Sequence, residues 1–267
     1  MKVSGKIAVC VLVATSLVAA ASALARPAAP SASARLLPDL DPVAPGSIQA
    51  IAADDGSGRI FLTFTFAFDN VGAGPLRLSA HRASTNQSVM VADQVVSTSG
   101  GGTVTIPRIG KVAWLPDRGF TRWGFKHQSY RLVPAGPGPT RVAETLPLCL
   151  EDNRRTPKSS LAGEPKDKVF KGRCGKRQDT LLKLELGLSV GWRNLHLAKR
   201  LGQLIDITKA RSGEYTLQTQ VNAAGKLAER STANNAASAR ISITWKQGSR
   251  LPTIKLLKTC DDSARCS

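Results

Sequence analysis

Large, mostly apolar residues occupy every second position in four stretches of the chain, residues 62–68, 182–188, 215–221 and 241–245. A period of two is typical of a β-strand that turns one face toward a hydrophobic core. Residues that favour turns separate these stretches, for example the three glycines at 100–102. Because no helical periodicity intervenes, the pattern predicts an all-β antiparallel β-sandwich over residues 37–267.

The first residues have the pattern of a targeting segment. Lys2 and Lys6 precede an uncharged stretch, residues 7–25, that ends in Ala-Leu-Ala. This order predicts a secretory signal peptide at residues 1–25, although the stretch is also long enough for an uncleaved membrane anchor. Residues 26–36 are rich in Ala, Ser and Pro and predict a flexible linker. We therefore expect a secreted or envelope-associated domain.

Cysteine usage agrees with export. Four cysteines follow the predicted signal peptide, and an even number in an oxidising compartment suggests two disulfides. Sequence order favours Cys149–Cys174 and Cys260–Cys266, although three connectivities are possible. The cysteines form no CxxC or Cys/His cluster, so a structural zinc site is not expected.

The chain is strongly basic and its charge is uneven. Lys and Arg number 37 against 19 Asp and Glu, a formal net charge of +18, which becomes +16 without residues 1–25. Nine basic residues against two acidic ones lie between residues 153 and 177, a local net charge of +7: Arg154, Arg155, Lys158, Lys166, Lys168, Lys171, Arg173, Lys176 and Arg177. We call residues 153–177 the basic loop.

A surface of this charge attracts polyanions. Outside the cytoplasm, the candidates are phospholipid head groups or anionic wall polymers of the envelope. No interleaving of aromatic and basic residues points to nucleic acid, so no nucleic-acid partner is expected. The alternative is that the charge only keeps a secreted domain soluble.

Several short segments resemble, in order, the lysyl oxidase-like domain family in its secreted bacterial form. They are residues 37–40, 59–62, 69–74, 122–125, 129–132, 148–152, 187–192, 203–208 and 213–217. The resemblance implies a β-sandwich built around a copper site and a quinone cofactor made from a Lys and a Tyr. It also implies oxidative deamination of primary amines, typically lysine side chains.

The family's copper ligands are three closely spaced histidines, and imidazole nitrogens suit Cu(II). Their positions here hold Phe120, Arg122 and Gly124. A guanidinium is always protonated and repels a metal ion. His127 is close in sequence, whereas His81 and His196 are far from it. We therefore expect no copper site of the family's kind.

The quinone positions differ as well. The family's Lys aligns with Thr145, and its Tyr aligns with His196. The only tyrosines, Tyr130 and Tyr215, lie in alternating stretches and are expected to pack in the core. His196 is either a hydrogen-bonded structural histidine or a general base, and no partner for a base is evident.

A calcium site found in several family members is partly kept. The resemblance assigns Asp39, Glu229, Asn234 and Asn235 to it, while a further Asp of the family is Ser231 here. Oxygen ligands suit a hard cation, so calcium is a possible cofactor. Alternatively, the two asparagines end a hairpin through turn hydrogen bonds.

Three hypotheses follow. The preferred one is a catalytically degenerate lysyl oxidase-like domain that binds an anionic envelope component or another secreted protein through its basic surface, with no cofactor expected. The alternative is a copper-dependent amine oxidase with relocated ligands, which would need copper and lysine tyrosylquinone. The third is a purely structural or adaptor domain.

Overall fold

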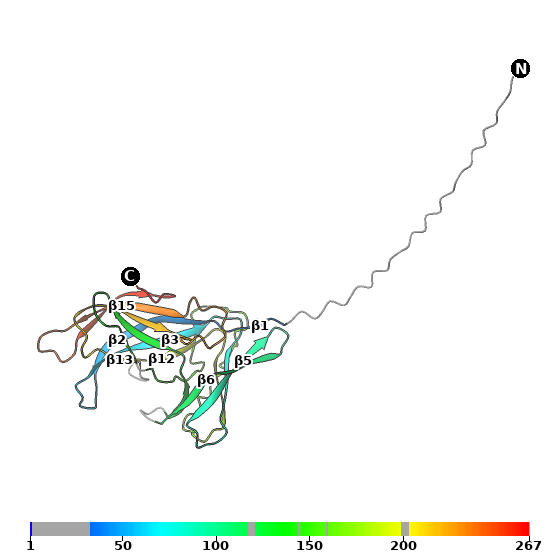
Figure 1. The fold of residues 1–267 in the computed structure, drawn as a ribbon, viewed down its shortest axis with the longest axis horizontal. Helices are drawn as coiled ribbons and strands as arrows, with labels where there is room; N and C mark the ends of the chain where they lie inside the picture. Colours follow the sequence, from blue (N-terminus) through cyan, green and yellow to red (C-terminus); the bar gives the residue numbers. More distant parts are fainter. Residues whose placement is uncertain (2–32, 117–120, 144, 159, 199–202, 267) are drawn as a thin grey trace. The chain divides into compact units, whose positions relative to one another are not determined.

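Antiparallel pairing between the alternating segments produces three β-sheets in the computed structural model of the chain (Figure 1). The structure describes residues 1, 33–116, 121–143, 145–158, 160–198 and 203–266. No helix occurs in these residues, which confirms the predicted all-β antiparallel class. It follows that none of them belongs to a helix that could cross a membrane.

Each sheet combines strands from distant parts of the sequence. The first sheet has the order β11 (Lys183–Leu188), β4 (Leu76–His81), β5 (Val89–Thr98), β6 (Thr103–Leu115), β7 (Arg122–Phe125), and β1 (Arg35–Leu36) pairs with β5. The second has the order β10 (Arg154–Arg155), β12 (Trp192–His196), β3 (Ile60–Asn70), β13 (Leu204–Asp206), and β2 (Leu40–Ala52) pairs with β3. The third has the order β16 (Thr253–Cys260), β15 (Ala236–Thr244), β14 (Gly213–Gln220), β8 (Ser129–Pro134), β9 (Arg141–Val142).

The four alternating stretches correspond to β3, β11, β14 and β15. The three glycines at 100–102 form the turn between β5 and β6, where Gly101 has a φ of 81°. Leu182 departs from the pattern, because it lies just before the edge strand β11 and is exposed.

One hydrophobic core lies between the sheets. Phe64, Phe66 and Phe68 of β3 are fully buried, and the Tyr130 ring from β8 lies 5.1 Å from the rings of both Phe64 and Phe66. Burial of one such ring contributes about 1.5–3 kcal/mol. Strand β2 also packs against β15, and Figure 1 shows the two together. The second and third sheets therefore share the core, and Tyr130 and Tyr215 are both buried in it, as predicted.

The described residues cover only part of the predicted N-terminal segments. The predicted signal peptide and residues 26–32 of the predicted linker lie outside the described residues. Residues 33–36 belong to the folded unit, because Arg35 and Leu36 pair with Thr98 and Ser97. Backbone pairing therefore extends the folded unit to residue 33, four residues before the predicted start of the domain, through a segment whose side chains carry no strand pattern.

The buried carboxylate of Asp152 fixes the base of the basic loop. It accepts hydrogen bonds from Val169 N (2.9 Å), Phe170 N (3.1 Å), Ser189 N (2.8 Å) and Ser189 Oγ (2.8 Å). Asp152 N also donates to Phe170 O at 2.8 Å. One side chain thus ties the loop to the turn between β11 and β12.

Asp152→Ala should lower the free energy of unfolding by about 3 kcal/mol or more, because buried donors lose their acceptor. Urea unfolding followed by tryptophan fluorescence measures this change. Glu185→Ala is the control, since Glu185 forms an exposed ion pair with Arg77 and should cost less than about 1 kcal/mol. Equal losses in the two variants would contradict the role given to Asp152.

Candidate functional site

Two disulfides join the cysteines in the pairing that sequence order favours, Cys149–Cys174 and Cys260–Cys266. The first closes the part of the basic loop that precedes Cys174, and Lys176 and Arg177 follow directly after it. All nine basic residues are exposed, so the predicted basic surface is present. The nine cations nevertheless differ in what they contact.

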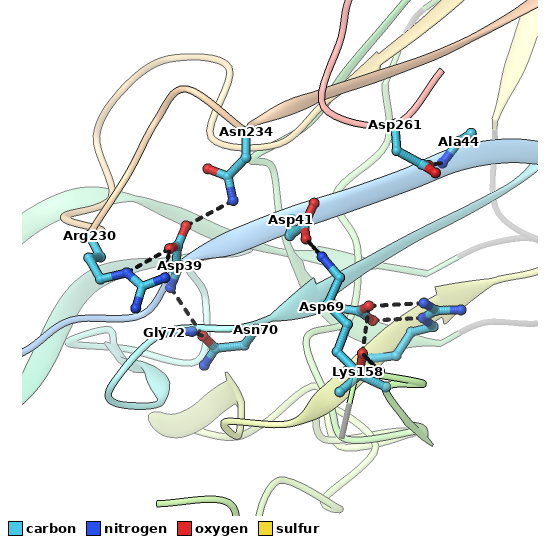
Figure 2. Close-up of polar contacts among 12 residues, drawn as sticks. Asp39, Asp41, Ala44, Asp69, Asn70, Gly72, Lys158, Arg230, Asn234 and Asp261 are labelled. Carbon is cyan, nitrogen blue, oxygen red and sulfur yellow. Dashed lines mark hydrogen bonds and ion pairs between the residues drawn. The ribbon is translucent and has the colours of Figure 1, made fainter. Parts of the chain in front are cut away.

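Three of the nine are held by contacts within the domain. Arg155 forms an ion pair with Glu164 and stacks 4.6 Å from the centre of the Trp192 ring. Lys158 forms an ion pair with the buried Asp41 (Figure 2). Lys168 Nζ donates to Asn153 O at 3.3 Å. These three cations hold the loop in place and have less freedom to bind a ligand.

Three other cations surround an unusual turn at the end of the loop. Arg173, Cys174, Gly175 and Arg177 have φ angles of 48°, 50°, 58° and 60°. Each non-glycine residue in this left-handed region costs roughly 1–2 kcal/mol, so surrounding contacts must hold the turn.

Those contacts are visible around Trp123. Its backbone nitrogen donates to Cys174 O at 2.9 Å, and its indole nitrogen donates to Gln178 O at 2.9 Å. Arg177 N donates to Thr121 O at 2.8 Å. With the Cys149–Cys174 disulfide, these bonds fix the turn against β7.

The turn surrounds an open hollow of about 340 Å³ lined by Gly172, Arg173, Lys176, Arg177 and Gln178. Within the described residues, Arg173, Lys176 and Arg177 form no ion pair. Arg173 also lowers the pKa of the neighbouring Arg122, after the larger effect of burial. The hollow is therefore a concentrated positive region, and we call it the cationic hollow.

Two of the three positions that the resemblance matches to copper ligands, Arg122 and Gly124, lie beside this turn, on β7. Phe120 lies outside the described residues. Arg122 is half-buried, and burial lowers the pKa of its guanidinium while Glu151 opposes that shift. Gly124 has no room for a side chain: a Cβ there would lie 2.7 Å from the backbone of Pro147. Neither described position fits a metal ligand.

His127 is buried between aromatic rings. Its Nδ1 lies 3.2 Å from Phe125 O, so Nδ1 carries the proton in the neutral ring. Its Nε2 is buried and has no hydrogen-bond partner among the residues that the structure describes. Burial lowers the pKa of His127 to about 4, and the Phe125 carbonyl only partly offsets that effect.

His196 lies at the end of β12, opposite Phe66 of β3. Its Nε2 hydrogen-bonds Asn194 Oδ1, which leaves Nδ1 as the nitrogen with a free lone pair. The pKa of His196 is lowered to about 3, mainly by burial and to a smaller extent by the positive charges of His127 and Arg122. Folding thus brings His196 close to Arg122 and His127, which lie far from it in the sequence.

This interior group does not have the composition of the family's catalytic centre. It offers two imidazoles and a guanidinium, and the described residues contain no group of three or more His, Cys, Asp or Glu that could hold a metal. Of the two positions that the resemblance assigns to the quinone, Thr145 is buried and carries no amine, and the other is His196. The side chains at these two positions and at Arg122 and Gly124 are therefore not the ligands and precursors that the resemblance implies.

The residues assigned to calcium do gather at the start of β2. Arg230 and Asn234 donate to Asp39, whereas Asn235 and the Leu40 backbone nitrogen donate to Glu229. Sequence reasoning did not include Arg230. Sequence reasoning also missed the structural role of Asp152. A buried carboxylate that accepts hydrogen bonds from backbone nitrogens does not require particular residue types at fixed positions, so no motif reveals it.

Comparison with known proteins bears on these features. Residues 147–250 match the sequence model of the family described as lysyl oxidase. Residues 147–250 therefore carry the sequence pattern of a lysyl oxidase-like domain. The match begins after β7 and Thr145, and it includes the basic loop from residue 153, His196 and residues 229–235. No curated protein matches the chain.

The two buried imidazoles should make the lysyl oxidase-like domain sensitive to acid. Their pKa values in the folded state, about 4 and about 3, lie below the ordinary 6.5, so the unfolded chain binds more protons below pH 6.5. The free energy of unfolding should fall as pH drops from about 6.5 toward 4, by about 3 kcal/mol for His127 alone.

Urea unfolding at several pH values, on the wild type and His127→Gln, measures this contribution. The variant should lose part of the dependence on pH, because glutamine stays neutral. His81→Gln, at an exposed position, should keep the wild-type dependence. An unchanged pH dependence in His127→Gln would contradict the assignment.

Proposed function

We propose that this chain is an exported, catalytically degenerate lysyl oxidase-like domain that binds a phosphate-bearing anionic component of the cell envelope through the cationic hollow. The observation that carries the proposal is the convergence of Arg173, Lys176 and Arg177 on one rigid turn without acidic partners among the described residues. The other exposed cations of the basic loop extend the same positive surface.

The charge distribution favours a polyanion over a single carboxylate. Three cations within five residues offer more donors than one carboxylate accepts, whereas a phosphodiester presents several oxygens and repeats along a polymer or membrane surface. Anionic phospholipid head groups and wall polymers share this chemistry.

The rigidity of the turn supports specific rather than diffuse attraction. A disulfide and several hydrogen bonds hold the backbone that carries the three cations. Less backbone freedom is then lost when a ligand binds, which improves affinity without further contacts.

The absence of catalysis is supported by the chemistry of the replaced positions. Arg122 carries a permanent positive charge, Gly124 leaves no room for a ligand side chain, and Thr145 and His196 are not the residues from which the quinone is made. Export is supported by the N-terminal pattern and by the two disulfides, since disulfides persist in oxidising compartments.

Replacing Arg173, Lys176 and Arg177 by glutamine should weaken binding to vesicles that contain phosphatidylglycerol on the order of 100-fold, at about 1 kcal/mol for each basic residue near the surface. Vesicle co-sedimentation at several salt concentrations measures the change. The wild-type affinity should fall as salt rises, because salt screens exposed charges.

A matched control removes the same charge elsewhere, with Lys226, Lys246 and Arg250 replaced by glutamine; all three are exposed and lie outside the basic loop. This control should lose much less affinity. Equal losses would show that net charge, not the hollow, drives binding. Purified anionic wall polymer replaces the vesicles in a second arm, which separates the two sources of phosphate.

Copper loading tests the catalytic part of the proposal. Protein expressed with its N-terminal segment and incubated with Cu(II) should contain far less than one copper per chain by elemental analysis. It should also fail to stain in a redox-cycling assay for quinones. Near-stoichiometric copper together with a positive stain would establish the alternative, an amine oxidase with relocated ligands.

A further inference from the structure

A cluster of two carboxylates and three carboxamides joins the start of β2 to residues 222–235. The carboxylates belong to Asp39 and Glu229, and the carboxamides to Asn222, Asn234 and Asn235. Asp39 is 2% exposed and Asn235 is 4% exposed. Asp39 is buried and Glu229 is partly buried, and negative charges removed from water in this way need a compensating charge or a full set of donors.

For Asp39, the compensating charge comes from Arg230. The guanidinium places Nε 2.9 Å and Nη2 2.8 Å from Asp39 Oδ2. Asn234 Nδ2 donates to the other carboxylate oxygen at 3.0 Å (Figure 2). Arg230 N also donates to Pro38 O at 2.7 Å. Arg230 therefore binds the segment before β2 with both its backbone and its side chain.

Glu229 has no cation of its own among the described residues. Its Oε1 accepts from Asn222 Nδ2 and Asn235 Nδ2, each at 2.6 Å, and its Oε2 accepts from Leu40 N at 3.1 Å. Burial raises the pKa of the Glu229 carboxyl, and the charge of Asp39 adds to this effect. The donors around Glu229 only partly replace a positive charge.

Two oxygens in the cluster have no hydrogen-bond partner in the part of the chain that the structure describes. They are the buried Oδ1 atoms of Asn234 and Asn235. A half-turn of each amide exchanges its Nδ2 and Oδ1, which would place a carbonyl oxygen beside Asp39 and Glu229. Two carboxylates and two carboxamide oxygens form the kind of donor set that binds calcium.

We propose that the Arg230 guanidinium is the built-in cation of this cluster, that it makes the domain independent of calcium, and that its removal exposes a divalent-cation site formed by Asp39, Glu229, Asn234 and Asn235. An arginine is always charged and covalently attached, so it does this without a free ion. The residues the resemblance assigned to calcium thus come together, but in the wild type a side chain takes the place of the ion. This inference does not depend on the cationic hollow.

Thermal unfolding with calcium or with EDTA tests the proposal. The wild-type melting temperature should be the same in both. Arg230→Ala should melt lower in EDTA, because Asp39 loses its counter-charge, and millimolar calcium should raise its melting temperature by roughly 5 °C. In Asp39→Asn/Arg230→Ala, which lacks one carboxylate ligand, calcium should have much less effect.

Arg240→Ala is the matched control, since Arg240 forms an exposed ion pair with Glu214 and lies outside the cluster. It should show no response to calcium. A wild-type melting temperature that rises with calcium or falls with EDTA overturns the proposal. So does an Arg230→Ala variant whose melting temperature does not change with calcium.

Should Arg230→Ala fail to fold, Arg230→Gln replaces it. Equilibrium dialysis of the wild type against calcium gives an independent result, because bound calcium near one per chain overturns the proposal.

Discussion

The position of the basic loop depends on one buried carboxylate. Asp152 accepts hydrogen bonds from Val169 and Phe170 of the basic loop and from Ser189 in the turn after β11. These bonds attach a mostly exposed segment, whose like charges repel one another, to the core. Nine like charges on the basic loop repel one another, and a hydrophobic contact alone would not restrain them. The disulfide at Cys174 and the ion pair of Lys158 with Asp41 add further attachments, but both act on a loop whose base Asp152 already fixes.

The sequence predicted the architecture well where a local pattern carries the information. The period of two in residues 62–68 reports directly which side chains of β3 face the core, and Phe64, Phe66 and Phe68 are all buried. The same argument failed for Leu182, because periodicity does not reveal that β11 is an edge strand. It also missed β1, whose pairing with β5 uses backbone groups that every sequence possesses.

The candidate site was predicted less completely, for a different physical reason. Charge is visible in a sequence, so the basic loop could be named in advance, but its partners are not. The folded structure shows that Arg155 forms an ion pair with Glu164 and that Lys158 forms one with Asp41. Arg173, Lys176 and Arg177, in contrast, form no ion pair within the described residues and line the cationic hollow. Likewise, His127 and His196 interact electrostatically because distant parts of the chain meet in the core. Their positions in the sequence do not predict this interaction.

The close approach of Pro147 to Gly124 bears on how this protein can change over time. A histidine introduced at position 124 would meet backbone atoms less than 3 Å from its Cβ, so the segment that carries Leu148 and Cys149 would have to move first. That segment is fixed to β7 through Phe125 and Leu148, and to the basic loop through the disulfide. A histidine at this position therefore requires several simultaneous changes rather than one. Each contact that stabilises β7 against the segment around Leu148 also opposes any larger side chain at position 124.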